Sequence, residues 1–189
     1  RSDDMLTITG GKWTRRSIKT TARRKTRYTP QSARKALFDI VDVASKSFID
    51  LFAGSAIMSF EAMSRGAAEA ISVDVSKKAC NLILDNRNEL DPSMNLRIVC
   101  ADFRRAIPSL IRQGVGADTV FADPPFDEEY IEPFFTVLNQ NPELINHWGQ
   151  LIVETSEREK KTVLELSSLF QLVDQREYAG VVFSIMVRQ

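Results

Sequence analysis

Residues 48–56 read FIDLFAGSA, and this stretch decides the fold of the chain. An apolar run over residues 48–52 passes into a loop of small residues at 53–56, and a helical stretch follows over residues 57–65. A strand, a small-residue turn and a helix in this order open a βαβ unit. The turn holds a single glycine, Gly54, whereas a dinucleotide-binding loop needs the pattern GxGxxG, so a nicotinamide or flavin site is disfavoured.

The same alternation continues towards the C-terminus. Short apolar runs at residues 70–75, 96–100, 119–122 and 151–154 are separated by helical stretches at 77–90, 105–112 and 131–139. Near-continuous apolar strands separated by helices predict an α/β fold, a parallel sheet with helices on both faces. The last β-rich runs, residues 170–178 and 181–187, are joined by the tight turn Ala179-Gly180 and predict an antiparallel hairpin that closes the sheet.

A further helix precedes the quoted stretch. Thr29-Pro30 predicts its start, with Thr29 as N-cap and Pro30 at the first helical position, where a missing N–H costs nothing. Helical spacing predicts that Arg34 and Lys35 point away from the body, and that the buried face consists of Ala33, Leu37, Ile40, Val41 and Ala44.

The charges of this chain are unevenly distributed. The 189 residues are 43% apolar and carry 25 basic and 25 acidic side chains, which predicts one neutral globular domain with a sizeable core. Residues 1–35 hold eleven basic and two acidic side chains, a net charge of +9, and the remainder carries −9. A basic segment on an acidic body suggests a nucleic-acid contact at one end.

The first 28 residues are polar, basic and poorly periodic, with a break at Gly10-Gly11 and anchors at Ile8, Trp13 and Ile18. They predict a basic N-terminal arm or small hairpin that contacts RNA, and residues 29–189 form the main domain. A solvated, disordered tail is the alternative.

Cysteine and histidine are scarce. Cys80 and Cys100 lie in apolar surroundings and are interpreted as core thiols of a protein from a reducing cytosol, and with only His147 besides, we expect no structural metal. No apolar run reaches the roughly 20 residues that span a bilayer, and the start lacks the apolar region of a signal peptide, so we expect no membrane partner.

Acidic residues follow four of the predicted strands. They are Asp50, Asp74, Asp102 and Asp123, the last within Asp123-Pro124-Pro125-Phe126. Ligands of open parallel sheets bind beyond the carboxyl ends of the strands. Asp74 is placed to accept two ribose hydroxyls, while Asp102 and Phe103 are placed to bind the amino group and cover the face of an adenine ring. Taken singly, Asp74, Asp102 or Asp123 is as readily the N-cap of the next helix, Asp102 most of all.

These residues resemble motifs I to IV of the class I S-adenosylmethionine-dependent methyltransferases, in which a motif like Asp123-Pro124-Pro125-Phe126 belongs to enzymes that methylate exocyclic amino groups of bases. Gly10-Gly11-Lys12-Trp13, the basic stretch up to Pro30, and residues 34–38, 50–55, 61–62 and 64–67 are further similar to the bacterial guanine-N2 methyltransferases of small-subunit (16S) ribosomal RNA, the RsmD type. The resemblance covers nearly the whole chain.

The resemblance implies a Rossmann-like fold with a seven-stranded, mostly parallel sheet, S-adenosylmethionine as cofactor, ribosomal RNA or an assembling small subunit as partner, a cytoplasmic location and a monomer. Its catalytic residues would be Asp123, Pro124, Pro125 and Phe126. Its cofactor-binding residues would be Asp50, Phe52, Ala53, Gly54, Ser55, Asp74, Asp102, Phe103 and Asp123. Its RNA-binding residues would be Lys12, Trp13, Arg15, Arg16, Arg23, Arg24, Lys25 and Arg27.

The chain departs from the family pattern in three places. Gly54-Ser55-Ala56 stands where the family usually has Gly-Ser-Gly, and alanine fits there unless the residue needs a positive φ. Arg27-Tyr28-Thr29-Pro30 stands where Arg-Pro-Thr is usual, and Asp74 replaces a common glutamate but keeps its acceptors.

Two other functions fit the same residues. The Asp123 motif alone does not choose between amino groups, so an adenine-N6 or DNA methyltransferase is one alternative. A non-catalytic RNA-binding assembly factor that retains the fold is the other, and the joint presence of the four acids argues against it.

Overall fold

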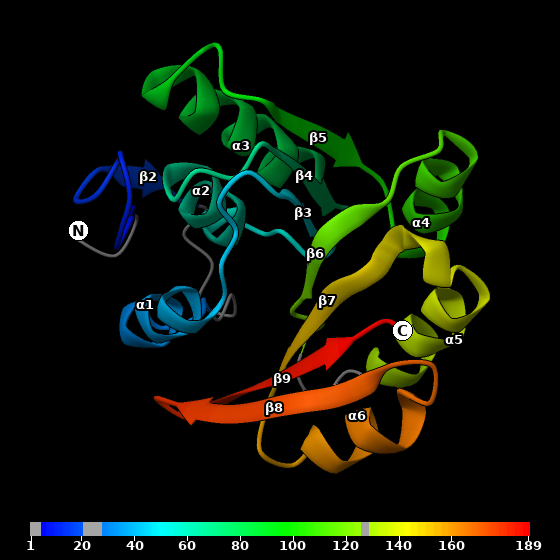
Figure 1. Cartoon of the computed structure of the whole chain (residues 1–189). Coiled ribbons are helices and arrows are strands. Elements are labelled where there is room, and N and C mark those ends of the chain that lie inside the picture. The colour runs from blue at the N-terminus through cyan, green and yellow to red at the C-terminus, as the bar shows by residue number, and fades with distance from the viewer. Residues whose placement is uncertain (1–4, 21–27, 126–128) are drawn as a thin grey trace.

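The computed structural model describes residues 5–20, 28–125 and 129–189, whose arrangement is shown in Figure 1. The helices in this part of the chain are α1 (Gln31–Ile40), α2 (Ile57–Ser64), α3 (Lys77–Leu90), α4 (Phe103–Arg112), α5 (Ile131–Gln140), α6 (Lys160–Leu166) and the short 3-10 helix η1 (Pro142–Leu144). The strands are β1 (Met5–Thr7), β2 (Ser17–Lys19), β3 (Ser47–Asp50), β4 (Glu69–Asp74), β5 (Leu96–Cys100), β6 (Ala117–Ala122), β7 (Ile145–Thr155), β8 (Gln171–Tyr178) and β9 (Val181–Val187).

Seven strands form one sheet in the order β5-β4-β3-β6-β7-β9-β8. The first five of these run parallel, and β9 lies antiparallel to both β7 and β8, so the predicted parallel sheet with its C-terminal antiparallel hairpin is confirmed. From β3 the chain moves outward to β4 and β5, then returns to the other side of β3 to form β6 and β7. A reversal of this kind opens a crevice beyond the carboxyl ends of the two central strands, β3 and β6.

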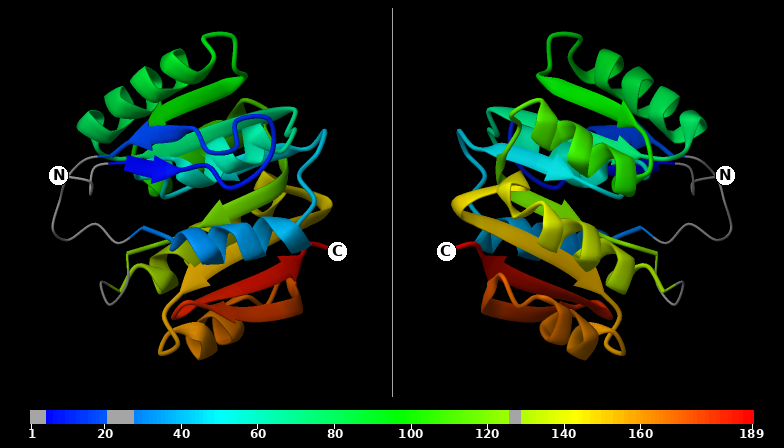
Figure 2. Two further views of the ribbon diagram at one scale, coloured as in Figure 1. Left: turned by 90° about the vertical axis from the view of Figure 1, so that its left-hand side faces the viewer. Right: turned by 90° about the vertical axis from the view of Figure 1, so that its right-hand side faces the viewer.

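Helices cover both faces of the sheet, as the two views of Figure 2 show, and each face has its own apolar core. The core under α1, α2 and α3 includes Leu37, Phe60 and Ile83. The core under α4, α5 and α6 includes Ile107 and Phe134. A parallel sheet needs this double cover because both of its faces are apolar.

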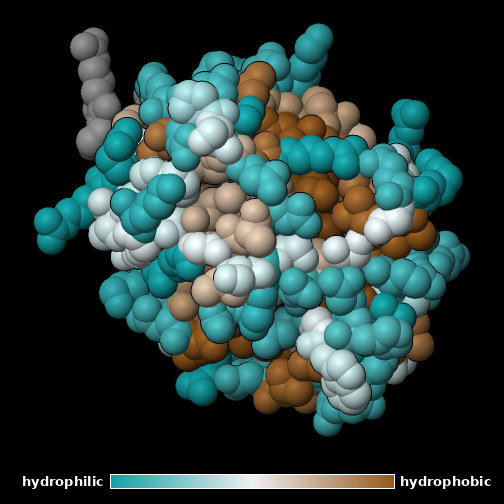
Figure 3. All heavy atoms as spheres, turned by 45° about the horizontal axis from the view of Figure 1, so that its top comes forward, coloured by the Kyte–Doolittle hydropathy of each residue, from teal (hydrophilic) through white to brown (hydrophobic). Residues whose placement is uncertain are grey.

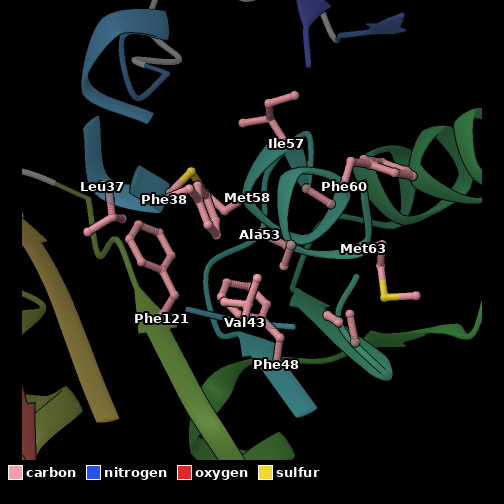
Figure 4. Packing of buried hydrophobic residues seen from close by; sticks show 14 of the residues in the cluster. Leu37, Phe38, Val43, Phe48, Ala53, Ile57, Met58, Phe60, Met63 and Phe121 are labelled. Atoms are coloured by element: carbon pink, nitrogen blue, oxygen red, sulfur yellow. The ribbon is translucent and has the colours of Figure 1, made fainter. Parts of the chain in front are cut away.

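The first core continues into the loop that follows β3. Figure 4 shows Leu37 and Phe38 of α1, Met58 of α2 and Phe121 of β6 gathered around this core, together with Ala53 of the loop. By contrast, the outer surface in Figure 3 is mostly polar, with apolar atoms showing between polar side chains. Helix α2, which follows this loop of residues 53–56, is therefore held in place by close packing.

The antiparallel strands β1 and β2 form a small hairpin that packs on α2. Its anchors Ile8, Trp13 and Ile18 are all buried in the first core, as the sequence predicted for anchors. The turn at Gly11 lies so close to α2 that a Cβ there would be 1.9 Å from the backbone oxygen of Ser64, and its φ is +80°. Only glycine permits this approach.

Two expectations for the first helix are wrong. The helix begins at Gln31 without a side-chain cap, because the Thr29 hydroxyl instead donates to Glu154 Oε1 at 2.5 Å. Arg34 does not point away but is 1% exposed, and it donates to the backbone oxygens of Thr29 and Thr7 at 2.6 and 2.9 Å. Its charge is neutralised by a buried partner, Glu61, whose Oε1 lies 3.5 Å from the Arg34 Nε.

Other expectations fail at the edges of elements. Ile40, predicted for the buried face of α1, is 45% exposed. Cys80 is buried as predicted, but Cys100 is exposed because it ends β5, the strand at the edge of the sheet. Helix α6 lies in a segment where the sequence pattern predicts no element.

Candidate active site

A cavity of about 700 Å³ lies beyond the carboxyl ends of the parallel strands. All nine residues that the sequence proposed for the cofactor line it, and so do Pro124 and Pro125. Phe126 lies outside the described residues. The residues singled out from the sequence therefore meet at one cavity.

Asp50 ends β3 at the point where the strand order reverses, beside Phe121 of β6. Its side chain is 1% exposed, and the oxygen Oδ1 has no hydrogen-bond partner. The pKa of Asp50 is raised to about 8, chiefly by burial and further by the charges of Asp74 and Glu154, while a backbone hydrogen bond from Phe52 acts in the opposite direction. A buried carboxyl group without a full set of donors is costly, so this position favours a ligand that brings positive charge or a donor.

Asp74 ends β4 and shapes the loop after β3. Its Oδ2 accepts the backbone N–H of Gly54 at 2.8 Å, and its Oδ1 accepts that of Ser76 at 2.8 Å. A Cβ on Gly54 would meet no atom within 4 Å, so this glycine borders open space and not a packed neighbour. The loop therefore leaves room for a ligand against its backbone, and Asp74 fixes it in that shape.

Asp102 combines the two roles that the sequence left open. It is the N-cap of α4, accepting the Arg104 backbone N–H at 2.9 Å, and it also lines the cavity. The next residue, Phe103, belongs to an aromatic cluster in which the Phe52 ring lies 5.1 Å away and the Tyr130 ring 6.4 Å away. These rings give this end of the cavity an apolar wall suited to a flat ring system.

Ala56, one of the positions at which the chain departs from the family pattern, adopts φ +61° and ψ +25° directly before α2. An L-residue pays roughly 1–2 kcal/mol in this left-handed region because its Cβ crowds the carbonyl oxygen. The condition under which alanine is a strained replacement for glycine is therefore met, in a loop that borders the cavity.

The other end of the cavity lies over β6 and β7. Asp123 is half-buried and Pro124 is buried, and both face the same space as Glu154 near the end of β7. Tyr28, Thr29 and Ser156 also line this end. Sequence reasoning missed four residues at this end of the cavity, namely Tyr28, Thr29, Glu154 and Ser156. The one available signal was that Glu154, an acid, ends an apolar run as the other site acids do.

The residues proposed for RNA are divided between the surface and the interior. Lys12, Arg15 and Arg16 are exposed on the hairpin. Trp13 is 8% exposed and packs in the first core, so its ring has little surface to offer an RNA base. The remaining four, Arg23, Arg24, Lys25 and Arg27, lie outside the described residues.

Comparison with known families and proteins shows which family this chain belongs to. The model of the family described as "Conserved hypothetical protein 95" matches residues 6–187. The chain belongs to this family. Over 152 residues it is 28% identical to a Bacillus subtilis protein named "Putative rRNA methyltransferase YlbH", covering 79% of this chain and 82% of that protein.

A named protein and a solved structure, both from Escherichia coli, extend the comparison. "Ribosomal RNA small subunit methyltransferase D" is 28% identical over 138 residues, which are 72% of this chain and 68% of that protein. The solved structure titled "Putative methyltransferase yhhF" superposes with a TM-score of 0.81 at 25% identity, covering 98% of each chain. The resemblance to RsmD-type, S-adenosylmethionine-dependent methyltransferases and the class I fold are thus confirmed.

Within residues 5–20, 28–125 and 129–189, no helix is both long and apolar enough to cross a membrane.

Proposed function

We propose that this protein transfers a methyl group from S-adenosylmethionine to the exocyclic N2 of a guanine in small-subunit ribosomal RNA. The observation that carries the proposal is a single cavity with two ends. One end, over β3, β4 and β5, is lined by acids and aromatic rings, and the other, over β6 and β7, by Asp123 and the two prolines that follow it. The names of the relatives support ribosomal RNA as the substrate class.

The first end suits the chemistry of the cofactor, whose sulfonium supplies an electrophilic methyl group when it is bound. Asp74 offers carboxylate acceptors for ribose hydroxyls, and its position is fixed by Gly54 and Ser76. Phe103 offers a ring face, and the unpartnered oxygen of Asp50 offers a buried acceptor for a cationic group. A volume of about 700 Å³ is within the usual range for sites of this ligand size.

The second end suits an amino group that must be positioned more than activated. The lone pair of guanine N2 is delocalised into the ring, so the amine is a poor nucleophile. Asp123 and the backbone oxygen of Pro124 would accept its two N–H bonds and draw the nitrogen towards a pyramidal shape. Phe126 would stack on a base that has been flipped out of its helix. Held geometry of this kind contributes up to roughly 7–11 kcal/mol in favourable intramolecular cases.

The hairpin is proposed to bind RNA through its cations. Lys12, Arg15 and Arg16 are exposed on it and would neutralise phosphates together with the four cations between residues 23 and 27. On this proposal residues 1–28 are an RNA-binding extension and residues 29–189 the methyltransferase domain. Affinity would come from the phosphates and specificity from RNA shape and the flipped base.

The proposal is tested by identifying the methylated nucleoside. Small-subunit rRNA, assembled small subunits and DNA are each incubated with the protein and labelled S-adenosylmethionine, digested to nucleosides and separated. We expect label in N2-methylguanosine from one of the two rRNA substrates. The Asp123→Asn variant should lower this rate by about 10²–10⁴-fold while cofactor binding, measured by calorimetry, is largely retained.

The other outcomes identify the alternatives. Label in N6-methyladenosine or in DNA would replace the proposed target with another amino group. Failure to bind S-adenosylmethionine would favour a non-catalytic assembly factor. A nearly normal rate for Asp123→Asn would contradict the role of that residue.

A further inference from the structure

Glu154 is a buried acid that lines the cavity, and the proposed cofactor site gives it no role. It is the penultimate residue of β7, is 2% exposed and lines the cavity. In the sheet, β6 and β7 are parallel with Ala122 opposite Val153, so Asp123 and Glu154 leave neighbouring strands at the same edge. Neighbouring strands lie about 4.8 Å apart, so two acids face the proposed base position side by side.

The position of Glu154 is fixed by Thr29, which lies just before α1. Its Oε1 accepts the Thr29 hydroxyl at 2.5 Å, and the backbone oxygen of Thr29 accepts from Arg34 at 2.6 Å. The two oxygens of a carboxylate offer about four acceptor sites, and the Thr29 hydroxyl takes one of them. A carboxylate held rigidly at a cavity wall is suited to recognising one particular donor.

Guanine carries such a donor next to the proposed target atom. Along its Watson–Crick edge, N1–H and the N2 amino group are adjacent donors, whereas N1 of adenine is an acceptor. Enzymes that flip bases identify them by hydrogen bonds to this edge. We propose that Glu154 accepts the N1–H of the target guanine while Asp123 accepts from its N2 amino group, so that Glu154 determines the specificity for guanine.

This inference rests on the proposed function, because it assigns the second acid of the same site. It accounts for the presence of two neighbouring acids where amino-group positioning alone needs one. A base with a lone pair at N1 would face the Glu154 carboxylate and be rejected, since a site built around a hydrogen bond discriminates strongly against a partner that lacks it.

The test is a cycle that changes the protein and the base in turn. Small-subunit rRNA is prepared by splinted ligation with guanosine or 2-aminopurine riboside at the nucleotide that the wild type methylates, and is used naked or assembled, whichever the wild type accepts. Both bases carry the N2 amino group, but N1 of 2-aminopurine is an acceptor. The rates of N2 methylation are compared for the wild type and Glu154→Gln, whose amide keeps an acceptor for Thr29 and offers a donor to N1.

We expect the wild type to prefer guanosine and Glu154→Gln to reduce that preference by roughly tenfold or more, the size of a hydrogen bond to a charged group. The matched variant Thr29→Val removes the hydroxyl that holds Glu154 and should keep the preference while lowering both rates. Equal loss on both bases in Glu154→Gln would overturn the inference in favour of a purely structural role.

Two further results are decisive even if Glu154→Gln does not fold. A wild type that methylates 2-aminopurine as readily as guanosine would overturn the inference by itself. A wild type that forms no N2-methylguanosine on any rRNA would instead overturn the proposed function, so the two failures are distinguishable.

Discussion

Two buried acids in this molecule have opposite surroundings. Glu61 of α2 is fully buried, and its Oε1 accepts both the backbone N–H and the hydroxyl of Thr9, at 2.8 and 2.9 Å. Arg65 and Arg34 add positive charge beside it. Asp50 is equally buried, but one of its oxygens has no partner and its strongest charged neighbour is another acid, Asp74.

This difference distinguishes polar groups that stabilise the fold by pairing within the chain from polar groups that are available to bind a ligand. Where the hairpin meets α1 and α2, Arg34 and Glu61 have partners of opposite charge, although Arg34 Nε makes no hydrogen bond, and a Cβ at Gly11 would strike the backbone of Ser64. At the end of β3, the oxygen Oδ1 of Asp50 has no partner, and Gly54 in the loop that follows borders open space. Both regions contain buried acids and glycines, so these residue types alone do not distinguish them. The hydrogen-bond partners of the acids and the space around the glycines do.

The largest effect is expected at the satisfied acid. Glu61→Gln removes the negative charge beside Arg34, whose pKa burial already lowers, and leaves a buried cation without its counter-charge. Breaking a buried pair in this way costs about 3–5 kcal/mol. We expect a loss of this size in the free energy of unfolding, measured by urea denaturation, with the hairpin released first in hydrogen exchange.

A matched control exists on the same hairpin. Lys19 of β2 pairs with Glu89 of α3 at 2.9 Å, and both side chains are more than half exposed. An exposed pair of this kind contributes about 0–1 kcal/mol, so Glu89→Gln should be nearly neutral. Equal losses in the two variants would show that burial does not distinguish them.

The second prediction concerns the acid that lacks a partner. The pKa of Asp50 is raised to about 8 from an ordinary value of 3.8, so between these values the folded state binds more protons than the unfolded state. The contribution of Asp50 to stability is therefore complete below pH 3.8 and is lost as the pH rises towards 8. Between pH 5 and pH 7, the free energy of unfolding of the wild type should fall by up to about 1.4 kcal/mol per pH unit relative to that of Asp50→Asn.

Urea denaturation of both proteins across this range provides the measurement. Asp118→Asn is the control, because hydrogen bonds from Ser47 and Asn146 lower the pKa of Asp118, and that contribution is lost only below the usual range of an aspartate. Its stability should run parallel to that of the wild type between pH 5 and pH 7. If the free energies of unfolding of the wild type and Asp50→Asn changed in parallel with pH, Asp50 would be ionised in the folded protein, with hydrogen-bond partners for its charge.

The order of elements could be predicted from the sequence because apolar periodicity reports burial directly. β5, β9 and α3 begin and end where the pattern predicts. Arg34 could not be predicted, since amphipathic spacing assigns a cation to the outside and its partner Glu61 lies 27 residues away in the chain. Long-range pairing of this kind leaves no local signal.

The candidate site could be predicted where its residues follow strands, since strand ends converge at one edge of a parallel sheet. Asp50, Asp74 and Asp102 line the cavity for this reason. Glu154 was missed although it ends an apolar run as the other site acids do, and Thr29 was missed because its hydroxyl was assigned to a helix cap. The positive φ of Ala56 was foreseen only as a condition, since alanine itself gives no sign of it.

The third prediction compares Gly11 of the hairpin with Gly54 of the loop after β3. Both have positive φ, so an alanine at either costs roughly 1–2 kcal/mol in backbone strain. Gly11→Ala adds a backbone clash with α2 and should be the less stable variant by a further 1–3 kcal/mol or so, with S-adenosylmethionine affinity little changed. Gly54→Ala should instead fold well and bind the cofactor about tenfold or more weakly, because its methyl group occupies the cavity. Calorimetry and thermal unfolding of both variants check this, and a reversed pattern would contradict the contrast between the regions.

The smallest effect is expected at Ala56, where the cofactor loop stores strain that glycine would relieve. Ala56→Gly removes the cost of a Cβ at φ +61°, roughly 1–2 kcal/mol, but it also gives the unfolded chain more freedom, at about 0.4–1 kcal/mol. We therefore expect a net stabilisation of about 0–1.6 kcal/mol in urea denaturation. Ala36→Gly, within the regular turns of α1, is the matched control and should lose about 0.5–1 kcal/mol. If both variants lost stability equally, the left-handed backbone at Ala56 would carry no strain, and the loop would differ from the hairpin only in its unpartnered acid.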